Sequence, residues 1–182
     1  MAVKRAARRA DISDMTVPAT GDAPMGAHVD DLHAWVRTLA GCPPVTHTLQ
    51  ATCQHPAYGG EALTWFFVEA SAVDAIARLR CVACGRAIDV LDSGARWSYP
   101  PMHACAGCAQ SMVEVVVGVH TEAATGVDVA IEADGTGGPV TWAAVTCRSV
   151  TCGRLQGLTD MWVDPVPLER LPAALWRGAT PS

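Results

Sequence analysis

The feature that most constrains this chain is a set of eight cysteines, four of which form two closely spaced pairs. Cys81 and Cys84 are followed by Gly85, and Cys105 and Cys108 repeat the two-residue spacer after 20 intervening residues. A two-residue spacer lets one tight turn direct two thiolates at one metal, and glycine tolerates the positive φ that follows such a turn. The sequence therefore predicts one structural Zn²⁺ held by the thiolates of all four cysteines.

A second metal site is expected from the remaining cysteines. Cys147 and Cys152 are separated by four residues, and Gly153 follows them as Gly85 follows the first pair. Upstream partners are available at Cys42, His47, Cys53 and His55. Two residues that stand two apart on a strand face the same side, which favours the set Cys53, His55, Cys147 and Cys152. Cys42 in place of His55 is the main alternative, and buried, unligated cysteines are the competing interpretation.

Other uses of paired cysteines compete with zinc. One Cys-x2-Cys pair is typical of a redox dithiol, but two pairs without a thioredoxin-like βαβ pattern argue against that use. Disulfides require export, and polar residues interrupt the stretch after the basic start before any signal-peptide core forms. An iron–sulfur cluster stays open, since four thiolates also hold one. His103, two residues before Cys105, is interpreted as an exposed loop histidine.

Hydrophobic patterning predicts a β-rich α+β protein. Apolar residues recur with helical period over residues 32–39, and a second helix is expected over 73–80 because Ser71 and Asp74 resemble an N-cap box. A hairpin is expected around Asp92-Ser93-Gly94, and residues 112–119 fit either a strand or a helix. Strands are predicted for residues 45–53, 63–69, 87–91, 95–99, 113–119, 127–131 and 140–146.

These patterns divide the chain into four segments. Residues 1–27 form a disordered basic arm, and residues 28–80 an N-terminal part with the order helix, strand, strand, helix. Residues 81–114 form a zinc-ribbon or treble-clef module embedded in a small mixed domain. Residues 115–182 form a β-rich part with the second cysteine knuckle and a proline-containing tail.

The segment CVACGRAIDVLDSGARWSYPPMHACAGCAQSMVE, residues 81–114, resembles the treble-clef finger of the DksA/TraR type of RNA-polymerase-binding regulators. It shares Cys-x2-Cys-Gly, the apolar Ile88, a proline before the second pair, and Gln110 after it. The resemblance covers about one fifth of the chain, and no long coiled-coil hairpin precedes the finger. It implies a treble clef around one four-cysteine zinc and makes polymerase-associated regulation an alternative function.

The charge is unevenly placed along the chain. Residues 1–10 carry +4, from Lys4, Arg5, Arg8 and Arg9, so a net charge of -5 leaves -9 on the remainder. An acidic body repels a phosphate backbone, which restricts nucleic-acid binding to residues 4–9. The absence of asparagine and the single lysine indicate a high-GC genome, bacterial or phage.

The function expected from these observations is that of a zinc-binding, non-catalytic interaction or adaptor protein with a protein partner. A nucleic-acid-associated regulator that uses the arm and the finger is one alternative, and a thiol oxidoreductase or zinc hydrolase is another. No run of about 18 apolar residues is present to span a bilayer, so a cytoplasmic protein with reduced thiols is expected. The sequence leaves the oligomeric state open.

Overall fold

A computed structural model describes residues 24–54, 62–121, 140–166 and 176–177. Within these ranges the chain is rich in strands and has one α-helix, as expected of a β-rich α+β protein. In chain order the elements are α1 Val29–Val36, β1 His47–Gln50, β2 Cys53–Gln54, β3 Ala62–Leu63, β4 Trp65–Ser71, β5 Ile76–Cys81, β6 Ala87–Val90, the 3₁₀ turn η3 Ser93–Arg96, β7 Val113–Thr121, β8 Val140–Ser149, β9 Leu155–Val166 and β10 Trp176–Arg177.

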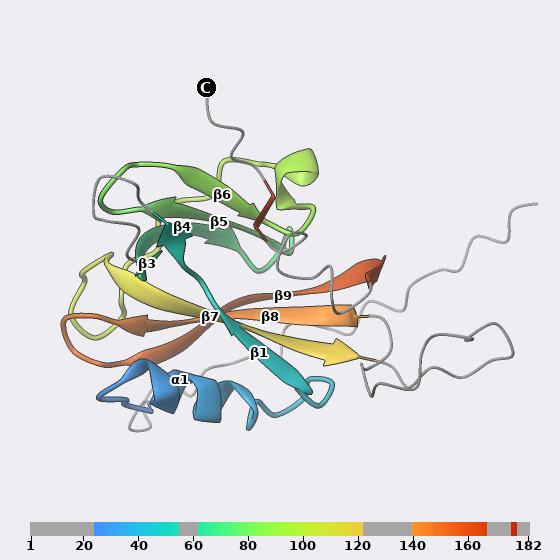
Figure 1. The fold of residues 1–182 in the computed structure, drawn as a ribbon, viewed down its shortest axis with the longest axis horizontal. Helices are drawn as coiled ribbons and strands as arrows, with labels where there is room; N and C mark the ends of the chain where they lie inside the picture. Colours follow the sequence, from blue (N-terminus) through green and yellow to red (C-terminus); the bar gives the residue numbers. More distant parts are fainter. Residues whose placement is uncertain (1–23, 55–61, 122–139, 167–175, 178–182) are drawn as a thin grey trace, which may run out of the picture.

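Eight strands form one antiparallel sheet that contains two three-stranded meanders. The order is β10-β6-β5-β4-β7-β8-β9, with β1 also paired to β7, while β2 and β3 form a separate hairpin. The meanders β4-β5-β6 and β7-β8-β9 meet where Phe66 of β4 pairs with Val113 of β7. The sheet folds over at this junction into two layers, with β4, β5 and β6 above β7, β8 and β9 (Figure 1).

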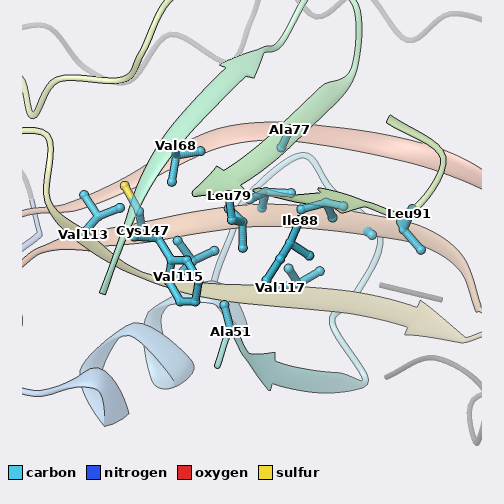
Figure 2. Close-up of a cluster of buried hydrophobic side chains, with 14 of the residues drawn as sticks. Ala51, Val68, Ala77, Leu79, Ile88, Leu91, Val113, Val115, Val117 and Cys147 are labelled. Atoms are coloured by element: carbon cyan, nitrogen blue, oxygen red, sulfur yellow. The ribbon is translucent and has the colours of Figure 1, made fainter. Parts of the chain in front are cut away.

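The main apolar core fills the space between these layers. Alternate residues of β7 face it, because successive side chains of a strand point to opposite faces. The contributors from β7 are Val113, Val115, Val117 and Val119, all fully buried. They meet buried residues of the upper layer, including Val68, Leu79 and Ile88 (Figure 2). This shared core makes the two meanders depend on each other for burial.

Helix α1 covers the outer face of the lower layer. Leu32 and Val36 are fully buried against Val116, confirming the helix predicted from the apolar period. A Cβ added at Gly118 would lie 2.8 Å from Cγ2 of Val36 and 3.1 Å from Cγ2 of Val45. Glycine at this position therefore allows the helix and the segment after it to approach the sheet closely.

The helix predicted for residues 73–80 is wrong, because residues 76–81 form strand β5. The Ser71 hydroxyl donates to the Asp74 carboxylate at 2.9 Å and accepts from the Asp74 amide at 3.1 Å. These bonds resemble an N-cap box, but here they close the turn between β4 and β5, with Ala75 at φ +52°. Local side-chain bonds of this kind serve turns as well as helix ends.

The predicted hairpin of residues 87–91 and 95–99 is half correct. Residues 87–90 form β6, but η3 follows and no strand forms over 95–99. The buried Ser93 hydroxyl donates to the Val90 carbonyl at 2.5 Å and accepts from the Ala77 amide at 3.0 Å, which fixes this turn. Strand β6 pairs with β5 and β10 instead.

The remaining strand predictions agree in part. Strand β7 resolves the ambiguity over residues 112–119, and β8 confirms the strand predicted over 140–146. The strand predicted over 127–131 lies outside the described residues. In the part of the chain that the structure describes, no helix has the length and apolar character required to cross a bilayer.

Candidate metal centre

Three tight turns of one backbone shape carry most of the candidate ligands. The first, second and third knuckles are residues 81–86, 105–110 and 149–154. In each, the amide of the fifth residue donates to the carbonyl of the first at 2.8–2.9 Å, and the amide of the first donates to the carbonyl of the sixth at 2.9 Å. The fifth residue has a positive φ in all three, at Gly85, Ala109 and Gly153. One local backbone design is therefore used three times.

The first triad consists of Cys53, Cys81 and Cys84, whose sulfurs lie within 4.8 Å of one another. Cys81 and Cys84 come from the first knuckle, which joins β5 to β6, and Cys53 comes from β2. The Sγ atoms of Cys53 and Cys84 are 3.7 Å apart, close to the edge of about 3.8 Å expected for a tetrahedron with Zn–S of about 2.3 Å. Cys53 and Cys81 are buried and Cys84 is exposed.

The thiols of the first triad have unequal proton affinities. Burial, followed by hydrogen bonding to Cys81 and Cys84, raises the pKa of Cys53 to about 12. Burial also opposes ionisation of Cys81, but backbone amides of the knuckle outweigh it and lower the pKa of Cys81. Within the triad the surroundings thus favour the thiolate of Cys81 and disfavour that of Cys53.

The second triad consists of Cys105, Cys108 and Cys152, again with sulfurs within 4.8 Å. It is built where the second knuckle faces the third, and the Sγ atoms of Cys105 and Cys152 are 3.6 Å apart. A Cβ added at Gly107 would lie 3.1 Å from Cδ of Arg154, so glycine permits the close contact between these knuckles. Both triads thus bring together segments that are far apart in the sequence.

Ser149 occupies the first position of the third knuckle, where the other two knuckles have cysteine. Its hydroxyl oxygen lies 3.4 Å from Sγ of Cys108 and accepts from the Cys152 amide at 3.3 Å. Hydrogen bonding to Ser149 is the main cause that lowers the pKa of Cys152 to about 7. Burial raises the pKa of Cys105.

These positions correct the grouping predicted from the sequence. Cys81 and Cys84 belong to one triad and Cys105 and Cys108 to another, so the four do not form one site. Cys53 joins the first pair and Cys152 joins the second, rather than joining each other. The spacing identified the turns correctly, but which turn faces which depends on how the sheet folds.

Cys147 belongs to neither triad and lies in the apolar core between Val113 and Val115 (Figure 2). It is fully buried, and burial raises the pKa of its thiol well above the usual range. Its sulfur is 3.7 Å from Nε2 of His103, which is half-buried rather than exposed as predicted. Burial lowers the pKa of His103, so its imidazole favours the neutral form.

Three other predicted candidates stand apart from the described triads. His55 lies outside the described residues, and its role as a ligand stays a prediction. Cys42, the alternative to His55, is half-buried and belongs to neither described triad. The ring of His47 is 3.1 Å from the hydroxyl of Thr46, and this histidine also belongs to neither described triad.

Two similar heptapeptides in the sequence indicate the role of Ser149, which the cysteine spacings alone do not reveal. Residues 80–86 read RCVACGR and residues 148–154 read RSVTCGR, which agree at five of seven positions. The apparent four-residue spacer after Cys147 is thus a two-residue spacer that begins at Ser149. Alignment of the two heptapeptides would have placed the third knuckle correctly.

No protein-family model, curated protein or solved structure matches this chain. The resemblance of residues 81–114 to the finger of DksA/TraR-type regulators therefore stays a prediction from the sequence. Within each of the two triads, the cysteine sulfurs lie close enough to one another to hold a metal ion.

Proposed function

We propose that the protein is a zinc-binding, non-catalytic interaction or adaptor protein in which two structural zinc ions hold the folded sheet together. The observation that carries this proposal is the presence of two cysteine triads, each with its sulfurs within 4.8 Å. Thiolates brought this close repel one another, and a divalent cation removes the repulsion. All eight cysteines are free thiols, as a reducing cytoplasm would keep them.

The donor chemistry supports zinc as the metal. Soft thiolates select Zn²⁺, Cu⁺ or iron–sulfur clusters over hard cations such as Mg²⁺ and Ca²⁺. The Sγ separations of 3.6 Å in the second triad and 3.7 Å in the first fit the edges of a tetrahedron around one ion at each site. Acid-labile sulfide distinguishes the iron–sulfur alternative.

A structural role follows from where the triads lie. The first triad fastens β2 to the turn between β5 and β6, and the second fastens residues 105–108 to the turn between β8 and β9. Each bound ion closes a long loop of chain, and its binding free energy adds to that of folding. The metals thus stabilise the folded sheet, and the surface of the folded protein binds the partner.

The surface beside the first triad supports recognition of a protein partner. A pocket of about 430 Å³ lies there, lined by Val82 and Ala83 of the first knuckle and by residues 62–65. Trp65 is 50% exposed at its wall. Half-exposed tryptophan next to apolar side chains is typical of protein-binding surfaces, and the chain beyond residue 10 carries -9, which opposes nucleic acid.

Native mass spectrometry of the full chain, with elemental analysis, tests the metal part of the proposal. We expect two zinc ions per chain, and we expect chelation to lower the free energy of unfolding by several kcal/mol. Protein whose stability is unchanged by chelation, or that contains iron and acid-labile sulfide, would contradict it.

A titration against duplex and single-stranded DNA tests the binding part. We expect weak, salt-sensitive binding by the full chain and none after residues 1–10 are deleted. Tight binding at physiological salt by the protein that lacks residues 1–10 would instead show that the folded body binds nucleic acid.

A further inference from the structure

We propose that Ser149 is the fourth ligand of the second triad, so that this site binds its metal through three thiolates and one hydroxyl oxygen. The inference rests on the proposed function, since it assumes that the second triad binds metal. It assigns the fourth ligand of the second site.

The first argument is that Ser149 and Cys81 are equivalent positions of two matching hairpins. Cys81 pairs with Phe66 of β4, and Ser149 pairs with Val113 of β7. Phe66 and Val113 are themselves paired at the junction of the two meanders. A pseudo-twofold axis at this junction therefore relates the first knuckle to the third.

Further bonds obey the same relation. The Val82 amide donates to the Trp65 carbonyl at 3.2 Å, and the Val150 amide donates to the Met112 carbonyl at 3.2 Å. The first and third knuckles are each flanked by two paired strand residues that stand seven apart in the sequence. Residue 80 lies opposite residue 87, and residue 148 lies opposite residue 155. Since Cys81 supplies a sulfur to the first triad, the equivalent side chain at Ser149 is directed at the second.

The second argument is the position of the Ser149 hydroxyl oxygen within the site. It is 3.4 Å from Sγ of Cys108. Around one zinc, with Zn–S of about 2.3 Å and Zn–O of about 2.0–2.2 Å, oxygen and sulfur ligands lie about 3.5–3.6 Å apart. The hydroxyl also accepts the amide of Cys152, the fourth residue of its knuckle, and Sγ of Cys105 accepts the amide of Gly107, the third residue of its own, at 3.4 Å. Both first-position side chains thus accept a backbone amide within their own knuckle.

The third argument is that the Ser149 hydroxyl lies on the buried side of the site. Ser149 is 1% exposed, whereas Cys108 and Cys152 are partly exposed. Residues 24–27 lie over the third knuckle, where the Gly26 amide donates to the Gly153 carbonyl at 2.8 Å and the Leu155 amide donates to the Pro24 carbonyl at 2.9 Å. On this buried side the hydroxyl is placed to complete a site of three thiolates.

A hydroxyl oxygen is a weaker ligand for Zn²⁺ than a thiolate, because it is harder and carries no charge unless it ionises. A thiolate in place of this hydroxyl would therefore hold the metal of the second triad more tightly.

Cobalt(II) substitution of the full chain tests the assignment, since the intensity of sulfur-to-cobalt charge-transfer absorption increases with the number of thiolate ligands. Ser149→Cys should add the intensity of one thiolate and slow removal of the second metal by a chelator by at least about tenfold. Ser149→Ala should open a coordination position, so that added azide shifts its spectrum but leaves the wild-type spectrum unchanged. Cys81→Ser, the matched variant of the first knuckle, should lose the intensity of one thiolate.

Two outcomes would overturn the assignment: azide shifting the wild-type spectrum as it shifts Ser149→Ala, or Ser149→Cys adding no charge-transfer intensity. Either would show that Ser149 makes only a hydrogen bond with Cys108. Wild-type protein that takes up no second metal would instead refute the proposed function, and the metal count of the wild type separates the two failures.

Discussion

The two triads use the same turn but complete it differently. The first knuckle supplies two cysteines and needs Cys53 from a distant hairpin, whereas the second triad draws ligands from two knuckles that face each other. One of those knuckles begins with Ser149 instead of cysteine and still has the same backbone bonds and the same positive φ. Backbone hydrogen bonds and a positive φ at the fifth residue therefore define the turn, while the first side chain determines which donor atom the turn offers.

The sharpest way to break this comparison is to remove a thiolate from the first triad. Cys84→Ser should weaken the first site, so that a chelator removes its ion before the other, and should lower the free energy of unfolding by several kcal/mol, because metal binding there contributes to folding. Native mass spectrometry and denaturant titration measure both effects. Cys42→Ser is the matched control, since Cys42 lies outside both described triads and should retain two metals. Two tightly held ions in Cys84→Ser would contradict the assignment.

The coupling between the two halves is tested at their junction. Phe66→Ala should lower the free energy of unfolding by about 3–5 kcal/mol, because Phe66 is fully buried where β4 meets β7. Both metals should still be lost in a single denaturant transition. Trp65→Ala, at the half-exposed neighbouring position, should cost clearly less. Separate release of the two metals along the titration would show that the halves unfold independently.

Cys147 tests whether a cysteine two residues before the third knuckle serves the metal or the core. Cys147→Ser should cost about 1–3 kcal/mol by burying a poorly satisfied hydroxyl in an apolar environment, with no change in metal count. Cys147→Ala, which buries no hydroxyl, is the control and should leave the metal count at two. Loss of one metal in either variant would show that Cys147 is a metal ligand.

The smallest expected effect concerns the reactivity of the metal-free thiols. Cys152 has a pKa of about 7 and Cys53 a pKa of about 12, and only the thiolate attacks iodoacetamide. Alkylation of Cys152 should therefore rise as pH increases through about 7, while Cys53 stays slow across that range. Peptide mass spectrometry of pulse-labelled protein measures each rate. The same pH profile at both residues would contradict the structural difference between the triads.

Local features of this fold were predictable because local residues determine them. The period of Leu32 and Val36 indicated helix α1, and the β-branched run after Met112 fits strand β7. The Cys-x2-Cys pairs identified two of the three knuckles. Each of these predictions depends on residues within one turn or one strand.

The partners of each knuckle were not predictable from spacing. Cys53 reaches Cys81 only because the sheet folds at the pairing of Phe66 with Val113, and no local pattern specifies that fold. The Ser71 and Asp74 pair misled for a related reason, since its bonds suit a helix start and a hairpin turn equally. The third knuckle was missed because a search for cysteines overlooks a serine in the same position.

Strands β1 and β10 give the molecule a property that concerns its synthesis rather than its chemistry. β1, from the N-terminal half, pairs with β7, and β10, near the end of the chain, pairs with β6. Synthesis proceeds from the N-terminus, so the edge of β6 stays unpaired until β10 leaves the ribosome. In the same way, β1 stays unpaired until β7 has been made. Residues up to 177 must be made before both of these strand pairs can form, and each pair joins segments that are distant in the sequence. Unprotected edges in the interval are sites where a nascent chain can pair with another copy, and early metal capture by the first knuckle would shorten that exposure.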